Sequence, residues 1–469
     1  MKKLIKFLIF AIYILSTVLV MYSIYSANII STNYMIVIFV IEVLLLFLIV
    51  KKIKSKKSRF GTKIFFSIIA MIISVINIMG MKYLNTTSNF VKNLSSNSIE
   101  KQTYSVLVLK ESSYSNIKEL NNKKIGFLEN NNEKKASAAL KLQARILFKS
   151  KNDNISNLIV NLNNNNIDAL ALDNEYIDVL KENQPDFIKN TKVIYKFTVI
   201  TTKKDKKNSS KLTNEPFIVY ISGSDTRGDI TSTGRSDVNM VAVVNPKDNK
   251  ILLVSIPRDY YVQLHNTYGV KDKLTHAGIY GIDMSKNTIE DLLNINVNYY
   301  LKVGFKTIIK SVDVIGGIDI NSDKSFTAYT NKNCSFTEGV NHVNGDCALA
   351  FSRERYAYVT GDRHRGQNQQ QVIEAIINKM SNPKVLIKYN EILKSIDGSF
   401  ETDMSYDEIT NLIKKELITL SKWKVESISL DGTGASMPTY SMGSQKLYVM
   451  IPDENTIVKA KEKINEYLK

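Results

Sequence analysis

The chain has 469 residues, of which 44% are hydrophobic and 23% charged, and its formal net charge at pH 7 is +17. The positive charge comes mainly from lysines scattered along the chain, and basic clusters are not interleaved with aromatic residues, which argues against nucleic-acid binding. A Lys excess instead favours anionic lipid or cell-wall polymer, or serves solubility alone.

Three apolar runs lie within the first 81 residues, at about 4–24, 34–50 and 64–81. A bilayer-spanning helix needs about 20 apolar residues, so we predict three transmembrane helices over residues 1–81. A signal peptide is the alternative for the first run, but the run lacks a small-residue cleavage site and two more runs follow it. Glu42 lies inside the second run, either as a functional carboxylate or as a neutral packed side chain.

Basic residues set the predicted orientation of the spans. Lysines precede the first run, and the loop 51–63 is strongly basic, whereas the loop 26–33 carries no charge. The positive-inside rule then puts the N-terminus and the basic loop in the cytoplasm and everything after residue 81 outside the cell. We therefore expect a multi-pass protein of the cell membrane with a large extracellular part.

The extracellular part divides into four segments by composition. Residues 82–102 are polar and read as a stalk, and residues 103–203 alternate strand and helix patterns typical of a small α/β accessory domain. This domain is either a spacer or a module that binds other wall or capsule machinery. A charged linker follows at 204–216. Residues 217–469 predict one three-layer α/β/α sandwich with a mixed central sheet.

Arginine is concentrated in one window of the chain. Seven of the nine arginines lie between Arg227 and Arg365, with several aspartates among them, whereas lysine supplies the positive charge elsewhere. The planar guanidinium fork grips phosphate oxygens bidentately, which the lysine ammonium cannot do. Arginines mixed with a few carboxylates therefore indicate a phosphate-binding site with a divalent metal.

Seven short motifs occur in order through the C-terminal half: GSDTR (223–227), GRSDVNMV (234–241), SIPRD (255–259), KLTHA (273–277), GGIDI (316–320), SRERY (352–356) and GDRHRGQNQQQ (361–371). With these motifs the chain resembles the LytR-CpsA-Psr family, and the three spans with an extra domain resemble its CpsA-like branch. The resemblance implies an enzyme that transfers a glycopolymer (capsule, teichoic acid or another wall glycan) from a polyprenyl-pyrophosphate carrier to peptidoglycan.

The resemblance also assigns roles to individual residues. It implies a Mg²⁺ (or Mn²⁺) ion held by Asp225 and Asp237. It places catalysis on Asp225, Asp237, Arg258 and Arg353. It gives pyrophosphate binding to Arg235, Arg258, Lys273, Arg353, Arg355, Arg365 and Gln369. Supporting roles fall to Arg227, Asp259 and Asp362. For Asp259, bracing of Arg258 and a direct role both remain open.

Two local expectations accompany these assignments. Arg353 and Arg355 stand two apart, so on a strand their side chains would share a face suited to one pyrophosphate. Asn368 stands where family members often have Arg. If that Arg holds phosphate or a helix end, Asn368 weakens the contact, and Arg363 could compensate from nearby. The residue that deprotonates the acceptor hydroxyl is not identified.

Two cysteines, Cys334 and Cys347, stand thirteen residues apart. An oxidising extracellular compartment permits a disulfide between them, and two small buried thiols are the alternative. For His276, a structural hydrogen bond competes with a proton-shuttle role.

Three functions of different classes fit these observations. The first is the transferase described above. The second is a polyprenyl-pyrophosphate pyrophosphatase, in which water takes the place of the acceptor. The third is a non-enzymatic membrane sensor or transcriptional attenuator, which would have no need of a metal-and-pyrophosphate site.

Overall fold

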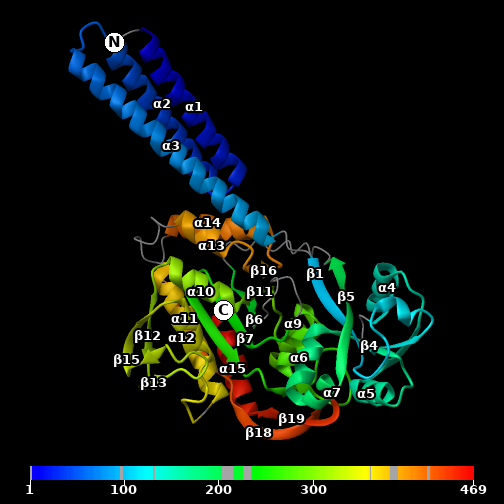
Figure 1. Cartoon of the computed structure of the whole chain (residues 1–469). Coiled ribbons are helices and arrows are strands. Elements are labelled where there is room, and N and C mark those ends of the chain that lie inside the picture. The colour runs from blue at the N-terminus through cyan, green and yellow to red at the C-terminus, as the bar shows by residue number, and fades with distance from the viewer. Residues whose placement is uncertain are drawn as a thin grey trace.

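The computed structural model describes residues 3–95, 99–129, 133–202, 215–224, 234–359, 361–380, 389–419 and 423–469. Three long N-terminal helices form a bundle that projects from two α/β domains (Figure 1). The accessory domain here means residues 99–202, and the C-terminal domain means residues 215–469. Most of the linker expected at 204–216 lies outside the described residues.

The three apolar runs form helices α1 (Lys3–Ala27), α2 (Thr32–Lys54) and α3 (Phe60–Ser95). Each contains a window with mean hydropathy between 2.4 and 2.7, so each is long and apolar enough to cross a membrane. Helix α3 has 36 residues and continues past the third apolar run, so residues 82–95 of the expected stalk are helical. Residues 99–102 of that stalk already belong to strand β1.

Glu42 is packed inside the bundle. Its side chain is 8% exposed, and its Oε2 accepts a hydrogen bond of 3.1 Å from the Thr17 hydroxyl. Asn77 of α3 in turn donates to Thr17 over 3.3 Å, and the Tyr13 hydroxyl donates to the Glu42 carbonyl. The Glu42 carboxyl group therefore links α2 to α1 directly and to α3 through Thr17. This environment fits the prediction that Glu42 is a packed side chain.

The accessory domain is a five-stranded sheet in the order β3-β2-β4-β1-β5, with helices on both faces. Its strands are β1 (Ile99–Leu109), β2 (Lys124–Leu128), β3 (Lys149–Asp153), β4 (Ala169–Asp173) and β5 (Thr191–Thr202). Its helices are η1 (Ile117–Leu120), α4 (Glu133–Ala144), α5 (Ile155–Asn163), α6 (Asn174–Asn183) and α7 (Pro185–Lys189). The β3-β2-β4 part is parallel, and β1 is antiparallel to both neighbours.

The C-terminal domain is built on a six-stranded mixed sheet in the order β16-β11-β6-β7-β8-β17. Its strands are β6 (Phe217–Ser224), β7 (Val238–Asn245), β8 (Lys250–Ile256), β11 (Tyr299–Gly304), β16 (Phe400–Thr402) and β17 (Lys424–Ser429). The β11–β6 and β8–β17 pairs are parallel, and the other pairs are antiparallel.

Alternate residues of the central strands enter two different cores, as a sheet covered on both faces requires. Val241 and Val243 pack with helices α9 (Ile282–Leu293) and α15 (Glu454–Tyr467). Met240 and Ala242 point to the opposite face, where Ile373 of helix α12 (Asp362–Met380) covers them. These two cores make the expected α/β/α sandwich.

Further elements complete the C-terminal domain. They are β9 (Tyr261–Val262), β10 (Asp272–Lys273), α8 (Leu274–Ala277), η2 (Gly278–Tyr280), α10 (Phe305–Val314), β12 (Ile318–Ser322), β13 (Phe326–Thr327), β14 (Ser335–Phe336), β15 (Gly339–Val343), α11 (Gly345–Arg353), α13 (Tyr389–Ile396), α14 (Tyr406–Thr419), β18 (Gly432–Thr439) and β19 (Gly443–Pro452). A separate core lies between α10, α11 and the short strands. Beside it, Cys334 and Cys347 form a disulfide with an S–S distance of 2.12 Å.

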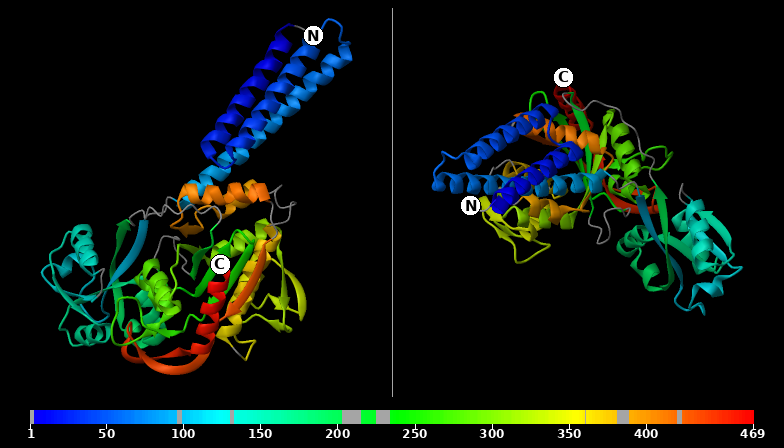
Figure 2. Two further views of the ribbon diagram at one scale, coloured as in Figure 1. Left: turned by 180° about the vertical axis from the view of Figure 1, so that it is seen from behind. Right: turned by 90° about the horizontal axis from the view of Figure 1, so that it is seen from above.

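The C-terminal domain sits directly against the end of the helical bundle where α1 is followed by α2. The Tyr406 hydroxyl of α14 donates to the Ala27 carbonyl over 2.6 Å, and Lys414 donates to the Asn28 side chain over 2.8 Å. Figure 2 shows from behind and from above that the accessory domain lies beside the C-terminal domain, not between that domain and the bundle. The accessory domain therefore does not act as a spacer that lifts the C-terminal domain away from the spans.

The two α/β domains share one apolar core. Ile279, Met442 and Leu447 of the C-terminal domain are buried in the same cluster as the α5, α6 and α7 side chains of the accessory domain. The Tyr176 hydroxyl of α6 also donates to the Ser441 carbonyl over 2.6 Å. The two domains are thus packed against each other and not merely tethered.

Candidate functional site

The candidate site lies at one edge of the central sheet, where three strand ends meet. Strand β6 ends at Ser224, β7 begins at Val238, and β8 ends at Ile256, and β7 runs antiparallel to both of its neighbours. The Asp237 amide donates to the Gly223 carbonyl over 2.8 Å, which continues the β6–β7 ladder by one residue. The aspartate just before β7 and the arginine just after β8 therefore lie side by side.

Asp237 and Arg258 form an ion pair through Oδ1 and a terminal guanidinium nitrogen. Their side chains are 13% and 20% exposed, so the pair is mostly enclosed but still reaches the surface. A charge-assisted hydrogen bond of this kind fixes both groups in one geometry. The structure thus brings together two of the residues that the family resemblance had assigned to catalysis.

Asp259 and Lys273 form a second pair directly behind the first. Lys273 Nζ lies 2.5 Å from Asp259 Oδ1, and Arg258 Nε lies 3.8 Å from Asp259 Oδ2. Burial by itself raises the pKa of the Asp259 carboxyl, but the charges of Lys273 and Arg258 outweigh burial and hold that pKa below its usual value. Asp259 therefore braces both cations, which is the supporting role left open for it.

Helix α12 closes the site from the other side. A shallow indentation is lined by Asp237, Ser255, Ile256, Pro257, Arg258, Arg365, Gly366, Gln369, Ser429 and Leu430. Gly366 permits the close approach of α12, because a Cβ atom there would lie 2.6 Å from the Ser255 hydroxyl oxygen. The indentation therefore presents two arginines, one glutamine and one carboxylate to whatever binds in it.

Asn368 and Gln370 do not point into this indentation but hold α12 in place. The Asn368 side chain is fully buried and donates to the Phe351 carbonyl in the last turn of α11 over 3.1 Å. Gln370 donates to the carbonyls of Leu253 and Ile428, on the neighbouring strands β8 and β17. Asn368, which stands where family members often have arginine, thus contacts the last turn of helix α11.

The expectation that Arg353 and Arg355 lie on a strand is wrong. Arg353 is the last residue of α11, and Arg355 lies in the turn that follows. The buried Glu354 carboxylate organises this turn by accepting the backbone N–H groups of Arg355, Tyr356 and Ala357. The Arg355 guanidinium lies 4.8 Å from the centre of the Tyr356 ring, and neither arginine is among the described residues that line the indentation.

Three of the predicted site residues cannot be placed by their side chains. Asp225 and Arg227 lie outside the described residues, and Asp362 begins α12 but its side chain is not described. Asp225 directly follows β6, whose end is paired with the start of β7 next to Asp237.

A divalent metal is compatible with the donors at the indentation. Within the described ranges, no group of three or more His, Cys, Asp or Glu side chains is arranged to hold a metal ion. Asp237 supplies one carboxylate there, with 13% of its side chain exposed. Mg²⁺ is commonly bound by one or two carboxylates together with phosphate oxygens and water, so this donor set fits a metal bound along with a phosphorylated ligand.

The accessory domain also contacts the candidate site, and no sequence motif predicts this contact. Glu182, next to the end of α6, forms two hydrogen bonds with the Arg235 guanidinium, of 2.7 and 2.9 Å. Arg235 is in turn close enough to Asp237 and Arg258 to interact electrostatically with both. One of the predicted pyrophosphate-binding arginines is therefore held by the other domain.

His276 belongs to a buried hydrogen-bonded group with Asp272 and Ser441. Its Nδ1 lies 2.7 Å from Asp272 Oδ1 and 2.8 Å from the Ser441 hydroxyl oxygen, and all three side chains are buried. Because both partners meet the same ring nitrogen, the group lacks the relay geometry of a nucleophilic triad, in which the base uses its two nitrogens separately. This arrangement fits a structural hydrogen bond for His276 and not a proton-shuttle role.

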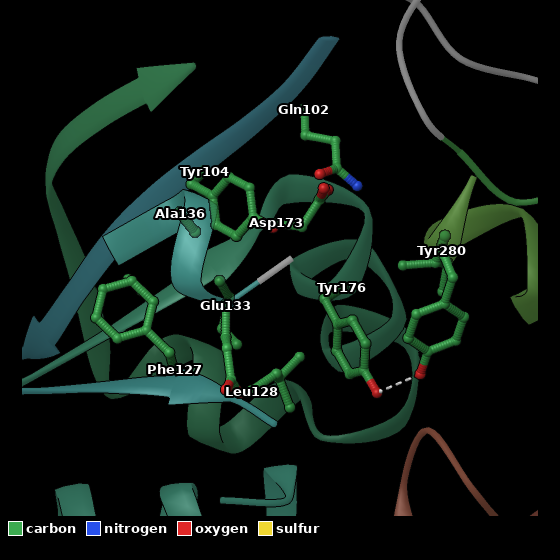
Figure 3. Close-up of a pocket in the computed structure, with 12 residues that line it drawn as sticks. Gln102, Tyr104, Phe127, Leu128, Glu133, Ala136, Asp173, Tyr176 and Tyr280 are labelled. Atoms are coloured by element: carbon green, nitrogen blue, oxygen red, sulfur yellow. Dashed lines mark hydrogen bonds between the residues drawn. The ribbon is translucent and has the colours of Figure 1, made fainter. Parts of the chain in front are cut away.

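A second cavity lies between the two domains (Figure 3). Its wall consists of accessory-domain residues together with Ile279 and Tyr280 of the C-terminal domain. Figure 3 shows the Tyr176 and Tyr280 hydroxyl groups turned toward each other, 3.3 Å apart. This cavity is separate from the indentation beside Asp237, because the two share no lining residue.

Comparison with known proteins matches this domain to one family. The model of the LytR_cpsA_psr family matches residues 187–466. A curated relative from Bacillus mycoides, named polyisoprenyl-teichoic acid–peptidoglycan teichoic acid transferase TagU, is 36% identical over 222 residues, which are 47% of this chain and 70% of the relative. A TagU of the same name from Enterococcus faecalis is 35% identical over 240 residues, 50% of this chain and 77% of the relative.

Among solved structures, that of TagV from B. subtilis is 28% identical, covers 54% of this chain and 98% of TagV, and has a TM-score of 0.45. The family model spans more than half of the chain and includes every residue at the sheet edge described above. The curated relatives are similar over about half of this chain. The chain belongs to the LytR-CpsA-Psr family.

Proposed function

We propose that this protein is a membrane-anchored phosphotransferase that moves a glycopolymer from a polyprenyl-pyrophosphate carrier to peptidoglycan. The observation that carries the proposal is the indentation at the sheet edge, where Arg258, Arg365, Gln369 and Asp237 converge. The curated relatives, which are named as teichoic acid transferases, support the same class of reaction.

The arrangement suits the charge of a pyrophosphate. Arg258 and Arg365 offer guanidinium forks to the phosphate oxygens, and Gln369 adds an uncharged donor. Phosphoryl transfer asks the protein mainly to position the reactants and to stabilise charge. A Mg²⁺ ion held by Asp237, with Asp225 as the second expected ligand, would neutralise further phosphate charge when bound.

The reaction balances without any other reactant. A peptidoglycan sugar hydroxyl attacks the phosphorus that carries the glycan. The bond from that phosphorus to the bridging oxygen breaks, polyprenyl monophosphate leaves, and the hydroxyl proton is released. The product is a phosphodiester between glycan and peptidoglycan.

The orientation proposed for the anchor rests on the basic residues at one end of the bundle. The basic residues Lys51, Lys52 and Lys54 lie in the last turn of α2, next to the α2–α3 loop. In Figure 1 that loop is at the end of the bundle far from both domains. By the positive-inside rule this end is cytoplasmic, so both domains are extracellular, on the side where peptidoglycan lies.

The test is reconstitution with the full-length protein in detergent. It is incubated with Mg²⁺, a polyprenyl-pyrophosphate-linked glycan and uncross-linked peptidoglycan, and the products are identified by mass spectrometry. We expect a glycan–peptidoglycan phosphodiester and polyprenyl monophosphate in equal amounts. Arg258→Ala and Asp237→Asn should lose both products. Both products formed at wild-type rates by these variants would refute the assignment of the site.

A further inference from the structure

Helix α6 of the accessory domain directs two carboxylates at the C-terminal domain. Glu175 lies in its first turn, and Glu182 lies seven residues further on. Seven residues are nearly two turns of an α-helix, so both side chains lie on the same face. Both of them lie close to Arg235, which belongs to the other domain.

The first contact fixes the guanidinium group. The two Glu182 oxygens lie 2.7 and 2.9 Å from the two terminal nitrogens of Arg235. This bidentate geometry sets the plane of the guanidinium as well as its place. It uses two of the five N–H donors of an arginine, so donors on the other edge of the fork can still face a phosphate.

The second carboxylate lies near the same residue. Glu175 is close enough to Arg235 and to Asp237 to interact electrostatically with both. One helix thus holds the tip of the Arg235 side chain and places a second carboxylate beside that residue. An arginine carries about 2 kcal/mol of side-chain rotamer entropy, which immobilisation before binding removes from the cost of binding.

The helix that provides these contacts is itself anchored. Besides the Tyr176 contact with Ser441, the Gln184 side chain donates to the Gln445 side chain over 2.9 Å, and Gln445 donates to the Asn183 carbonyl over 2.7 Å. Apolar side chains of α6 are buried in the core that the two domains share. Glu175 and Glu182 therefore sit on a rigid support.

We infer that Glu175 and Glu182 are positioning residues for pyrophosphate binding, and that the accessory domain completes the site by orienting Arg235 beside Asp237 and Arg258. This inference rests on the proposed function, because it takes pyrophosphate as the ligand of Arg235. It gives the accessory domain a role inside the same reaction, through an arginine that belongs to the C-terminal domain.

The experiment measures the dissociation constant of a polyprenyl pyrophosphate and the steady-state kinetics of transfer, with full-length protein in detergent. Glu182→Gln keeps the shape of the side chain but removes the charged pair. We expect it to weaken binding about fivefold, the loss of roughly 1 kcal/mol for an exposed ion pair, and to raise KM more than it lowers kcat. Glu182→Asp should recover part of the affinity.

Two controls separate positioning from a general structural effect. Asp186→Asn on the neighbouring helix α7 removes an exposed carboxylate that pairs with Lys189, and it should leave binding unchanged. In an Arg235→Ala background, Glu182→Gln should have no further effect on the dissociation constant. Equal thermal unfolding midpoints of the variants establish that the fold is intact.

Each other result overturns the inference. Tighter binding by Glu182→Gln would show that Glu182 competes with phosphate for Arg235. Unchanged binding would show that the contact has no part in the site. If the wild type itself binds no polyprenyl pyrophosphate, the proposed function fails as well, and that outcome is distinguished by the wild type alone.

Discussion

Replacement of Lys273 by methionine tests the charge network behind the indentation. Methionine keeps most of the apolar stem of the lysine but removes the ammonium group that lies 2.5 Å from Asp259 Oδ1. The Asp259 side chain is 5% exposed and the Lys273 side chain 15%, so water cannot easily replace the lost partner. The variant leaves a buried carboxylate whose nearest remaining cation is Arg258, 3.8 Å away.

The magnitude follows from this geometry. Removing one partner of a buried ion pair usually costs 3–5 kcal/mol. Because Arg258 still offsets part of the Asp259 charge, we expect about 3 kcal/mol of lost stability at neutral pH. For a domain of this size the loss corresponds to a fall of about 6–12 °C in the unfolding midpoint.

The measurement is thermal unfolding of the full-length protein in detergent, followed by the fluorescence of its single tryptophan, Trp423. The pKa of Asp259 is depressed in the folded protein, so its contribution is present above the usual pKa of an aspartate and is lost as the pH falls through the folded value. The effect of Lys273→Met should therefore shrink in acid. Asp259→Asn added to Lys273→Met should restore part of the stability, since the buried carboxylate that had lost its lysine partner is then removed. A loss below about 1 kcal/mol at pH 7 would refute the reasoning.

Three further predictions follow from single contacts. Joint replacement of Cys334 and Cys347 by serine should lower the unfolding free energy by about 3 kcal/mol, the loop-entropy value for a closed loop of this length, and added reductant should then no longer change the midpoint. Burial, followed by the charge of Asp178, raises the pKa of Glu175 to about 7. Stability contributed by the protonated Glu175 is therefore lost as the pH rises from the usual pKa of a glutamate through about 7. Glu175→Gln should raise the unfolding midpoint at pH 8 and not at pH 4. Gly366→Ala should weaken binding of a polyprenyl pyrophosphate, because the new Cβ would lie 2.6 Å from the Ser255 hydroxyl oxygen, and Ser255→Ala should restore binding by removing that oxygen.

The layers of the fold were predictable because they follow from local patterns. The apolar length of the first three runs predicts α1, α2 and α3, and the nearly continuous apolar run of β7 is typical of a strand covered on both faces. Asp237 directly precedes β7 and Arg258 follows β8, and the structure joins these adjoining strand ends through the ion pair of the two side chains.

The expectation for Arg353 and Arg355 failed because spacing by two is a weak signal. Two arginines two residues apart suit a strand, but the preceding residues have the apolar spacing of a helix, with Ala348 and Phe351 buried in the core beside α10. Asn344 caps the start of that helix by accepting the Cys347 amide. These helical signals outweigh the spacing of the two charges.

The contact between Glu182 and Arg235 could not be predicted from one sequence. The two residues are 53 positions apart and belong to different domains, and no local pattern links them. Only the packing of α6 on the C-terminal domain brings them together. The side chain that holds the arginine is thus set by the arrangement of the domains and not by a motif.

The most direct test of the central claim follows the oxygen that enters the product. The full-length protein is given Mg²⁺, a polyprenyl-pyrophosphate-linked glycan and peptidoglycan in water enriched in ¹⁸O, and the glycan phosphate is examined by mass spectrometry. The transferase account predicts glycan joined to peptidoglycan through a phosphodiester that contains no ¹⁸O, because the new oxygen comes from the sugar hydroxyl. Free glycan phosphate carrying one ¹⁸O, with no joined product, would show that water is the acceptor and would contradict the account.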